Sequence, residues 1–241
     1  MTLQPAKTPL SERQASILSK VTENGYVTIE ALAAQFGVSA QTVRRDIIAL
    51  SSAGHLQRFH GGAGPVAATE AARLDYPAKK AIGRPEKAAV GSKAAAMIPD
   101  GATVYLDVGT TVEACAVALS RRPGFTILTN SMPAAMMFDP AEHRVFVLGN
   151  RMAGRDGSLV GEDSTRILGK VTLDVAMIAC SAIEDTGRVM DFDIEKIAIK
   201  RAAMDVAKSS CLLATLSKFN RTALATIARI EQFDDIVTEA D

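Results

Sequence analysis

A Gly-Thr-Thr triplet at residues 109–111 follows a short apolar stretch and precedes a helical pattern. Free backbone N–H groups at the start of a helix, together with two hydroxyl groups, form a site for an anion such as phosphate. Two lysines much further along the chain, Lys200 and Lys218, could add positive charge. The same triplet is also an ordinary way to cap a helix, so the anion site needs support from its neighbours.

That support comes from polar residues that follow other apolar stretches. Asp107 precedes the triplet, Asn130 follows a second apolar stretch, and Lys218 follows a third. If these stretches are parallel strands, their carboxyl ends meet at one edge of a sheet, where ligands bind. The segment Arg155-Asp156-Gly157-Ser158 is predicted to be a loop that contacts hydroxyl groups. Each feature alone has a simpler interpretation as a helix cap or solvated surface, but their convergence on one edge favours a ligand site.

A second set of polar residues, near the start of the chain, has the types and spacing of a helix that contacts DNA. Arginine can bind a guanine edge through two hydrogen bonds, and glutamine can bind adenine. Arg45 and Gln41 are the candidates for these contacts, whereas Arg44 is equally suited to a phosphate. The full set of candidate DNA contacts is Ser39, Gln41, Thr42, Arg44, Arg45, Arg58 and His60.

Apolar spacing predicts the elements that hold these side chains. Residues 29–36 have the i, i+3, i+4, i+7 pattern of a helix, which Gly37 can end in a left-handed conformation. A second helix is predicted to begin at Ser39, a favourable N-cap. Residues 11–24 predict an earlier helix with a capping box, and residues 54–62 predict a turn, a strand and a turn, as in a wing. The alternative to a DNA-binding motif is a helical hairpin whose arginines are simply solvated.

The rest of the chain alternates apolar stretches with helical patterns. Strands are predicted at 103–107, 125–129, 144–149, 174–182, 211–216 and 234–239. Helices are predicted at 86–98, 112–120, 132–138, 164–171 and 194–210. This alternation predicts a mostly parallel sheet covered on both faces. We therefore expect an α/β protein with a winged helix-turn-helix domain at 1–65, a connector at 66–85 and a larger sheet domain at 86–241.

Composition excludes several other classes. The chain has 241 residues and a formal net charge of zero, so any nucleic-acid contact must come from a local patch. Tryptophan is absent, which argues against a protein that binds single strands by base stacking. The three cysteines are widely separated, and no Cys/His spacing indicates a metal or other cofactor. Without a signal-like start or an apolar run of membrane length, we expect a cytoplasmic protein with no membrane partner.

The motifs of both parts resemble those of one family. GYVTIEALAAQFGVSAQTVRRDIIAL with LQRFHGGA resembles the winged-helix signature of the DeoR family of bacterial repressors. DVGTT, LTNS, VLGNRM, SLVGE, EKIAIKRAAM and LSKF, in this order, resemble the effector domain of that family. The resemblance implies a fold similar to ribose-5-phosphate isomerase and sensing of phosphorylated sugars or polyols. DVGTTVEACAVAL, GRDGSLVGE and VMDFDIEKIAIKRA are most similar to members that respond to glycerol 3-phosphate.

The resemblance also assigns residues. It implies that the phosphate is held by Gly109, Thr110, Thr111 and Lys218. It implies that the carbon chain lies near Asp107, Asn130, Arg155, Asp156 and Lys200. The family has an aspartate three residues before the lysine, whereas this chain has Thr215, which removes one candidate base for isomerase chemistry.

We therefore favour a transcriptional repressor without enzymatic activity. It would bind double-stranded operator DNA as a homodimer or homotetramer and respond to glycerol 3-phosphate or a related sugar or polyol phosphate. The alternative is a sugar-phosphate isomerase-like enzyme that carries a DNA-binding appendage. A DNA-architectural protein without a ligand is a third hypothesis, which the polar strand ends disfavour.

Overall fold

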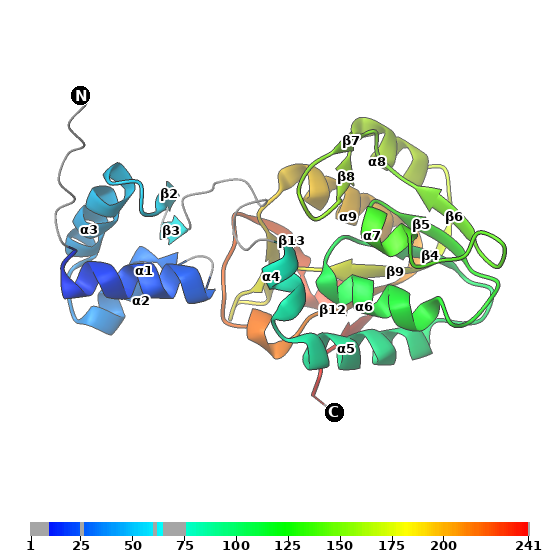
Figure 1. Ribbon diagram of the computed structural model, residues 1–241, viewed down its shortest axis with the longest axis horizontal. Coiled ribbons are helices and arrows are strands. Elements are labelled where there is room, and N and C mark those ends of the chain that lie inside the picture. Colours follow the sequence, from blue (N-terminus) through cyan, green and yellow to red (C-terminus); the bar gives the residue numbers. More distant parts are fainter. Residues whose placement is uncertain (1–9, 25–26, 60–61, 65–75, 241) are drawn as a thin grey trace, which may run out of the picture. The chain divides into compact units, whose positions relative to one another are not determined.

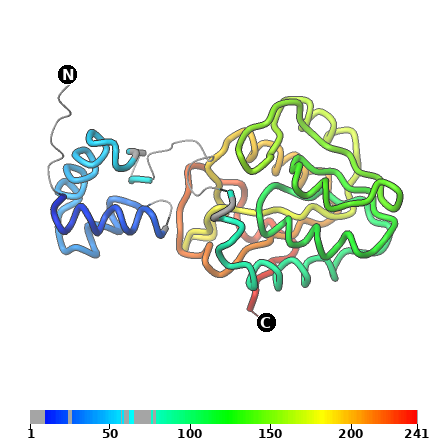
Figure 2. The backbone as a smooth tube through the Cα atoms, viewed as in Figure 1, coloured from blue at the N-terminus to red at the C-terminus, as the bar shows by residue number. Residues whose placement is uncertain are grey.

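The computed structural model describes residues 10–24, 27–59, 62–64 and 76–240. The chain divides into two compact units, residues 1–73 and 74–241, which Figure 1 shows as ribbons and Figure 2 as a tube. Part of the stretch 66–85 that the sequence predicts to be a connector forms a short helix, α4 (Tyr76–Ala81), which belongs to the second unit.

The first unit has the predicted helix-turn-helix. Its helices are α1 (Glu12–Asn24), α2 (Ile29–Phe36) and α3 (Ala40–Ser52). Its strands are β1 (Val27–Thr28), β2 (Gln57–Phe59) and β3 (Gly62–Gly64), which form an antiparallel sheet in the order β1-β3-β2. The predicted strand corresponds to β2, and β3 pairs with both other strands. The second predicted turn falls at residues 60–61, which lie outside the described residues.

Local chemistry explains the break between α2 and α3. Gly37 has φ 62° and ψ 32°, a left-handed conformation that costs glycine little, and its N–H donates to the carbonyl of Ala33. The hydroxyl of Ser39 accepts a hydrogen bond of 3.2 Å from the N–H of Thr42. The predicted capping box of α1 is also present, because Ser11 and Gln14 exchange hydrogen bonds of 3.1 and 3.2 Å. The caps at Gly37 and Ser39 fix the angle at which α3 begins.

The second unit is built on a six-stranded parallel sheet, which confirms the predicted class of fold. In spatial order its strands are β14 (Asp235–Val237), β12 (Ala207–Leu213), β9 (Leu173–Ala179), β4 (Thr103–Leu106), β5 (Thr126–Thr129) and β6 (Arg144–Val147). Side chains alternate between two buried clusters: Val104 and Leu106 pack in one, and Tyr105 in the other. Both faces of the sheet are therefore covered.

Helices form the two covering layers (Figure 1). They are α5 (Arg84–Met97), α6 (Thr110–Leu119), α7 (Met132–Ala135), α8 (Glu162–Leu168) and α9 (Ile194–Val206). Residues of α5, α6 and α7 contribute to one cluster, and residues of α8 and α9 to the other. No helix in the described part of the chain is long and apolar enough to cross a membrane.

The structure differs from the predicted elements in two places. Residues 207–210 continue a helical pattern in the sequence, yet they begin β12, because Ala207 and Ser209 pair with β9. Pairing along a buried strand thus overrides weak local helix propensity. The sequence also did not predict the hairpin of β7 (Arg151–Met152) and β8 (Leu159–Val160). Nor did it predict the antiparallel sheet of β10 (Ala182–Ile183), β11 (Arg188–Asp191) and β13 (Ala225–Arg229).

Helices α5 and α6 approach each other unusually closely at Gly91. A Cβ atom at this position would lie 2.5 Å from the backbone carbon of Ala114 and from the backbone nitrogen of Cys115. At the far end of the pair, Arg122 donates hydrogen bonds of 2.8 and 2.9 Å to the carbonyl oxygens of Ala95 and Ile98. Backbone packing and this arginine hold the two helices together.

Candidate functional site

The carboxyl edge of the parallel sheet gathers the charged side chains that the sequence singled out. Asp107 directly follows β4, and its Oδ2 accepts a hydrogen bond of 2.9 Å from the N–H of Ala179 at the end of β9. Lys200 reaches the same edge from α9, pairs with Asp107 and donates to the carbonyl oxygen of Ala179 at 3.1 Å. Lys200 also pairs with Asp191 of β11, with 3.3 Å between Nζ and Oδ2. Asp107, Asp191 and Lys200 thus form a buried charged triad.

The triad holds two carboxylates and one ammonium group, so its members differ in their tendency to ionise. Burial raises the pKa of Asp107, in spite of its pairing with Lys200. Burial also opposes ionisation of Asp191, but Lys200 and a hydrogen bond from Ser181 together lower the pKa of Asp191. Within the described residues, Oδ1 of Asp107 is buried without a hydrogen-bond partner. A buried carboxylate oxygen without a partner is energetically unfavourable.

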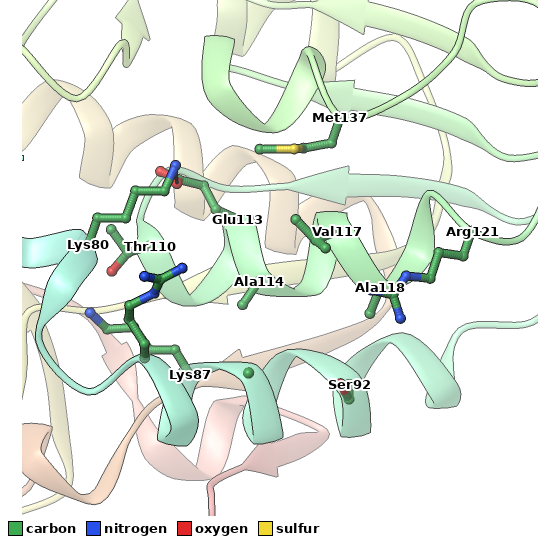
Figure 3. Close-up of a pocket in the computed structure, with 12 residues that line it drawn as sticks. Lys80, Lys87, Ser92, Thr110, Glu113, Ala114, Val117, Ala118, Arg121 and Met137 are labelled. Carbon is green, nitrogen blue, oxygen red and sulfur yellow. Dashed lines mark ion pairs between the residues drawn. The ribbon is translucent and has the colours of Figure 1, made fainter. Parts of the chain in front are cut away.

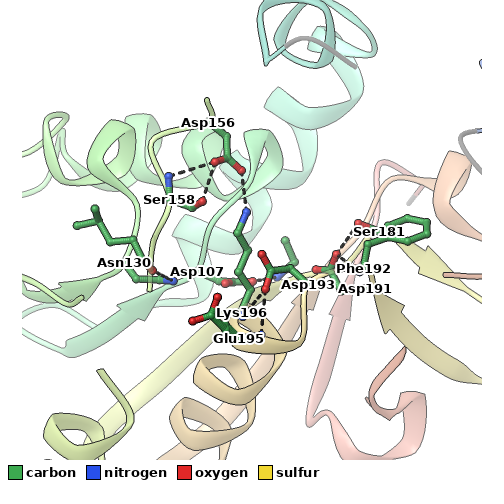
Figure 4. A network of polar contacts seen from close by, with 12 residues as sticks. Asp107, Asn130, Asp156, Ser158, Ser181, Asp191, Phe192, Asp193, Glu195 and Lys196 are labelled. Carbon is green, nitrogen blue, oxygen red and sulfur yellow. Dashed lines mark hydrogen bonds and ion pairs between the residues drawn. The ribbon is translucent and has the colours of Figure 1, made fainter. Parts of the chain in front are cut away.

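A second ion pair, which the sequence analysis missed, fixes the loop between β7 and β8. Nζ of Lys196 lies 3.1 Å from Oδ2 of Asp156, and the other carboxylate oxygen of Asp156 accepts a hydrogen bond of 2.7 Å from the hydroxyl of Ser158. Figure 4 shows the Lys196 side chain extending from α9 to this loop. Burial opposes ionisation of Asp156, but Lys196 and Ser158 lower its pKa. The i, i+4 spacing of Lys196 and Lys200 was the available signal for this pair.

Two further predicted ligand residues occupy different environments. Asn130 is fully buried, and its amide is engaged on both sides: its Oδ1 accepts from the hydroxyl of Tyr105 at 2.8 Å, and its Nδ2 donates to the carbonyl of Leu159 at 3.0 Å. Arg155 is exposed at the tip of the β7–β8 loop. The structure therefore places Asn130 at the sheet edge and Arg155 on the surface of the loop.

The Gly-Thr-Thr triplet begins α6, as the sequence predicts. Gly109 is the N-cap residue, with φ 129° and ψ 154°, a conformation that a residue with a side chain rarely adopts. Thr110 is half-buried and Thr111 is buried. The N–H groups of the first turn have no acceptor within the helix, so they are free to bind an anion.

Lys218 differs from the α9 lysines because it has no acidic partner. It is half-buried, and within the described part of the chain its ammonium group makes no hydrogen bond or ion pair. Burial lowers the pKa of Lys218, and the positive charges of Lys79 and Arg221 lower it further. A cation in such a place is electrostatically unfavourable until an anion binds near it.

Lys87 of α5 is a further cation that the sequence analysis missed. Its Nζ donates to the carbonyl oxygens of Lys79 and Ile82 at 2.5 and 2.6 Å, at the C-terminal end of α4. Burial, with the neighbouring charge of Lys218, lowers the pKa of Lys87 to about 8. Lys79, Lys87 and Lys218 thus form a cation cluster. Lys218 is far from the other two in the sequence, but Lys218 and Lys79 lower the pKa of Lys87, and Lys79 also lowers the pKa of Lys218. No sequence motif marks Lys87, which follows a glutamate at the start of an ordinary helical pattern.

A pocket of about 260 Å³ lies between α4, α5 and α6. Figure 3 shows Thr110, Glu113, Lys80 and Lys87 at one end of this pocket and Arg121 at the other. Small and apolar side chains line the part between these ends, among them Ala114 and Val117. Because Lys87 lines the pocket beside Thr110, the pocket connects the cation cluster with the start of α6.

The proposed DNA contacts lie on the exposed side of the first unit. Gln41, Arg44 and Arg45 are exposed, whereas Val43 and Ile47 on the same helix are buried. The remaining candidates are Ser39 at the N-cap, Thr42, whose hydroxyl contacts that of Ser39, and the exposed Arg58 on β2. His60 lies outside the described residues.

Asp46 completes the Arg-Arg-Asp motif from the inner side of α3. Its buried carboxylate pairs with Arg13 of α1 at 2.5 Å and accepts a hydrogen bond of 3.4 Å from Gln14. The motif therefore combines two exposed arginines with an aspartate that ties α3 to α1. This pairing fixes the orientation of the helix that carries the candidate base contacts.

The candidate site consists of charged and hydroxyl groups, without metal ligands or reactive thiols among the described residues. They contain no group of three or more His, Cys, Asp and Glu side chains arranged to hold a metal ion. Cys115, Cys180 and Cys211 are buried free thiols, and burial raises the pKa of each to about 12. These thiols are therefore protonated near neutral pH and poorly reactive.

A winged helix-turn-helix unit and a parallel α/β unit with a charged carboxyl edge define a DNA-binding regulator with a sensor domain. Family models match both units: a DeoR-like helix-turn-helix domain at residues 13–69 and a DeoR C-terminal sensor domain at residues 83–240. The chain belongs to the DeoR family, which confirms the resemblance seen in its motifs.

Relatives along nearly the whole chain are named as repressors. The glycerol-3-phosphate regulon repressor of Escherichia coli (strain K12) is 31% identical over 231 residues, which cover 95% of this chain and 91% of that protein. The transcriptional repressor CsqR of the same organism is 31% identical, covering 94% of this chain and 87% of that protein. These relatives place the chain among transcription regulators rather than enzymes.

Solved structures with similar folds are more distant. The eIF2B delta structure from Chaetomium thermophilum has a TM-score of 0.49 and 15% identity, covering 66% of this chain and 57% of that chain. Ribose 5-phosphate isomerase A from Methanocaldococcus jannaschii has a TM-score of 0.43 and 16% identity, covering 57% of this chain and 55% of that chain.

Proposed function

We propose that this chain represses transcription by binding operator DNA through α3 and the β2–β3 wing, and that it senses a phosphorylated small metabolite at the carboxyl edge of its sheet. Relatives named as glycerol-3-phosphate regulon repressors favour glycerol 3-phosphate or a related sugar or polyol phosphate as the effector. The repressor would act in the cytoplasm as a homodimer or homotetramer, because two-fold operators match two-fold proteins.

The single observation that carries the sensor proposal is the half-buried Lys218, whose ammonium group has no hydrogen-bond or ion-pair partner among the described residues. It lies close enough to Lys87 to lower the pKa of that lysine, and Lys87 lines the same pocket as Thr110. A phosphate at this point would receive N–H groups of the first turn of α6, hydroxyl groups and at least one ammonium group. The proposed phosphate contacts are therefore Gly109, Thr110, Thr111 and Lys218, with Lys87 added.

The charged triad supports a hydroxylated carbon chain next to the phosphate. The free Oδ1 of Asp107 would accept a hydrogen bond from a ligand hydroxyl group, which would satisfy the one buried carboxylate oxygen of the triad that has no partner. Lys200, Asn130 and Asp156 would position Asp107 and the loop beside it through the contacts already described. Arg155, exposed on that loop, would approach the ligand from the solvent side.

The proposal is tested by measuring operator binding with and without ligand. DNA from upstream of the chain's own gene is titrated with the full-length protein in buffer, in 1 mM glycerol 3-phosphate, and in the same concentration of glycerol or inorganic phosphate. We expect sequence-specific binding whose Kd changes with glycerol 3-phosphate and much less with glycerol. Specific DNA binding that no phosphorylated polyol or sugar changes would refute the sensor half, and absence of DNA binding would refute the repressor half.

The DNA half of the proposal has its own test on α3. Arg45→Ala should weaken operator binding by about 1–3 kcal/mol if Arg45 forms two hydrogen bonds to a base edge. Arg44→Ala is the matched control, since a phosphate contact would weaken binding to operator and random DNA alike. An equal loss on both DNAs for Arg45→Ala would assign that residue to the phosphate backbone instead.

A further inference from the structure

Helix α4 is fastened to the helix that carries the Gly-Thr-Thr triplet. The hydroxyl of Tyr76, the first residue of α4, donates a hydrogen bond of 2.8 Å to Oε2 of Glu113 in α6. Lys80, one turn later, lies 3.7 Å from the same oxygen, and its ammonium group lies 5.6 Å from the centre of the Tyr76 ring. One carboxylate oxygen of α6 thus binds two side chains of α4.

Glu113 occupies an unusual position for a glutamate. Its side chain is buried, with the residue only 4% exposed, and it lies one helical turn after Thr110. Burial raises the pKa of Glu113, while the hydrogen bond from Tyr76 and the charge of Lys80 act in the opposite direction. The two side chains that favour the charged form of this carboxylate, Tyr76 and Lys80, both belong to α4.

The other end of α4 is fastened to α5. Lys87 donates to the carbonyl oxygens of Lys79 and Ile82, the groups that the end of a short helix leaves without intrahelical partners. Lys87 also lines the same pocket as Thr110, so one side chain contacts the end of α4 and borders the proposed phosphate site. Each end of α4 is thus bound by a residue that is adjacent to that site.

The position of α4 in the chain gives these contacts a consequence. The boundary between the two units falls between Arg73 and Leu74, and α4 begins at Tyr76. It is the first element of the sensor unit that the structure describes after the boundary. Within the chain, α4 is therefore the described element that directly follows the junction between the two units.

We propose that the contact of Tyr76 and Lys80 with Glu113 transmits occupancy of the anion site to the junction between the two units. The proposal rests on the function proposed above and adds the route by which the ligand acts. Tyr76 and Glu113 are positioning residues on this route, because they act on the junction and not on the DNA.

The physical basis is competition for the same few charges. A phosphate dianion at the start of α6 lies one turn from the Glu113 carboxylate and repels it, which favours its protonation. The same dianion attracts Lys80 and Lys87, which now bind Glu113 and the end of α4. Ligand binding therefore weakens the contacts at both ends of α4. The ligand-bound and ligand-free states then differ in how α4 is held, and such a difference is required for the ligand to affect DNA binding.

The first test separates coupling from binding with the full-length chain. Tyr76→Phe removes one hydroxyl group and keeps the ring. We expect the Kd for glycerol 3-phosphate and the Kd for operator without ligand to stay within about threefold of the parent protein, whereas the ligand-induced change in operator Kd, of the order of 5–150-fold in coupled systems, falls several-fold. Lys208→Met, which removes an exposed ion pair with Asp174 at the opposite edge of the sheet, is the control and should leave this change intact.

The double variant Tyr76→Phe/Glu113→Gln sharpens this test. If the two residues act through their shared hydrogen bond, their effects on the ligand-induced change in operator Kd will not add. Full retention of that change in Tyr76→Phe and in the double variant, with both proteins folded by thermal unfolding, would overturn the proposal. A parent protein whose operator Kd no ligand changes would instead refute the proposed sensor function.

Hydrogen exchange supplies a readout that needs no DNA. Glycerol 3-phosphate should slow exchange in the first turn of α6, residues 110–113, and change exchange in residues 76–82 of the parent protein. In Tyr76→Phe the first effect should remain and the second should shrink. Protection at 110–113 without any change at 76–82 in the parent protein would overturn the route through α4, whereas no protection at 110–113 would count against the ligand site itself.

Discussion

The lysines of α9 and the lysines of the cation cluster lie in the same unit but in opposite electrostatic settings. Lys196 and Lys200 are 1% exposed, and each faces aspartate: Asp156 in one case, Asp107 and Asp191 in the other. Lys218 has no acidic partner within the described residues, and Lys87 donates only to backbone carbonyl oxygens. Buried ion pairs hold the residues of a site in place, whereas a cation without a partner can bind a ligand anion. The lysines of α9 are therefore expected to position the site, and the cation cluster is expected to bind the charged group of the ligand.

The largest effect that tests this difference between the two sets of lysines is expected when the ammonium group of the triad is removed. Lys200→Met leaves Asp107 and Asp191 buried together without a cation, and we expect the free energy of unfolding to fall by about 3–5 kcal/mol. Urea unfolding followed by circular dichroism measures the loss. The triple variant with Asp107→Asn and Asp191→Asn should recover much of it, because no uncompensated charge remains. A loss below about 1 kcal/mol in Lys200→Met would show that the triad does not depend on Lys200.

The same substitution in the cation cluster should have a different outcome. Lys218→Met removes a half-buried charge that neighbouring cations repel, so we expect the free energy of unfolding to stay the same or to rise. Affinity for glycerol 3-phosphate should fall about tenfold or more, because a hydrogen bond to a charged group contributes about 1.5–3 kcal/mol. Calorimetric titration with the ligand, together with urea unfolding, measures both quantities. Unchanged ligand affinity would remove Lys218 from the site.

A pH series gives a smaller effect and tests Lys87 of the cation cluster. The pKa of Lys87 is lowered to about 8, so in the absence of ligand the lysine loses its proton as the pH rises through this value. Phosphate binds the charged form, and the phosphate itself is a dianion above pH 7. Affinity for glycerol 3-phosphate should therefore fall about tenfold between pH 7 and pH 9. Four neighbouring charges act on the pKa of Lys87. Lys218 and Lys79 lower it, whereas Glu113 and Glu86 raise it.

Stability should respond to pH with the opposite sign. Because the folded state binds the Lys87 proton less tightly than the unfolded state, whose pKa is near 10.5, the free energy of unfolding gains from this group as pH rises above about 8. Lys87→Met should flatten both the affinity and the stability trends. An affinity that is constant from pH 7 to pH 9 in the parent protein would show that Lys87 is not a ligand contact.

The sequence predicts elements well where one local rule decides. Gly37 and Ser39 mark the helix break through backbone and capping chemistry, and the strands that end at Leu106 and Thr129 are short apolar runs. The start of β12 was wrong because residues 207–210 have helical propensity but pair with β9, a contact of more than thirty residues' separation. Short antiparallel strands such as β10 are likewise fixed by partners and not by their own pattern.

The candidate site follows the same division. Polar residues at the end of a predicted strand or directly after one, such as Asp107 and Asn130, lie at the carboxyl edge because parallel topology requires it. The division between paired and unpaired lysines could not be predicted, since Lys200 and Lys218 look alike in the sequence and differ only in whether tertiary structure supplies aspartates. Lys87, Glu113 and Tyr76 were missed for a related reason: they come from three different helices, and no motif links them.

The contact at Gly91 limits where the sensor can yield to a ligand. Helices α5 and α6 touch through their backbones at this residue, so the start of α6 and the lysine that holds the end of α4 belong to one stiff piece. A force applied by a ligand at one end of such a piece cannot be absorbed by sliding the two helices apart. It passes instead to α4, which is joined to this piece through the contacts of Tyr76 and Lys80 with Glu113 and of Lys87 with the end of α4.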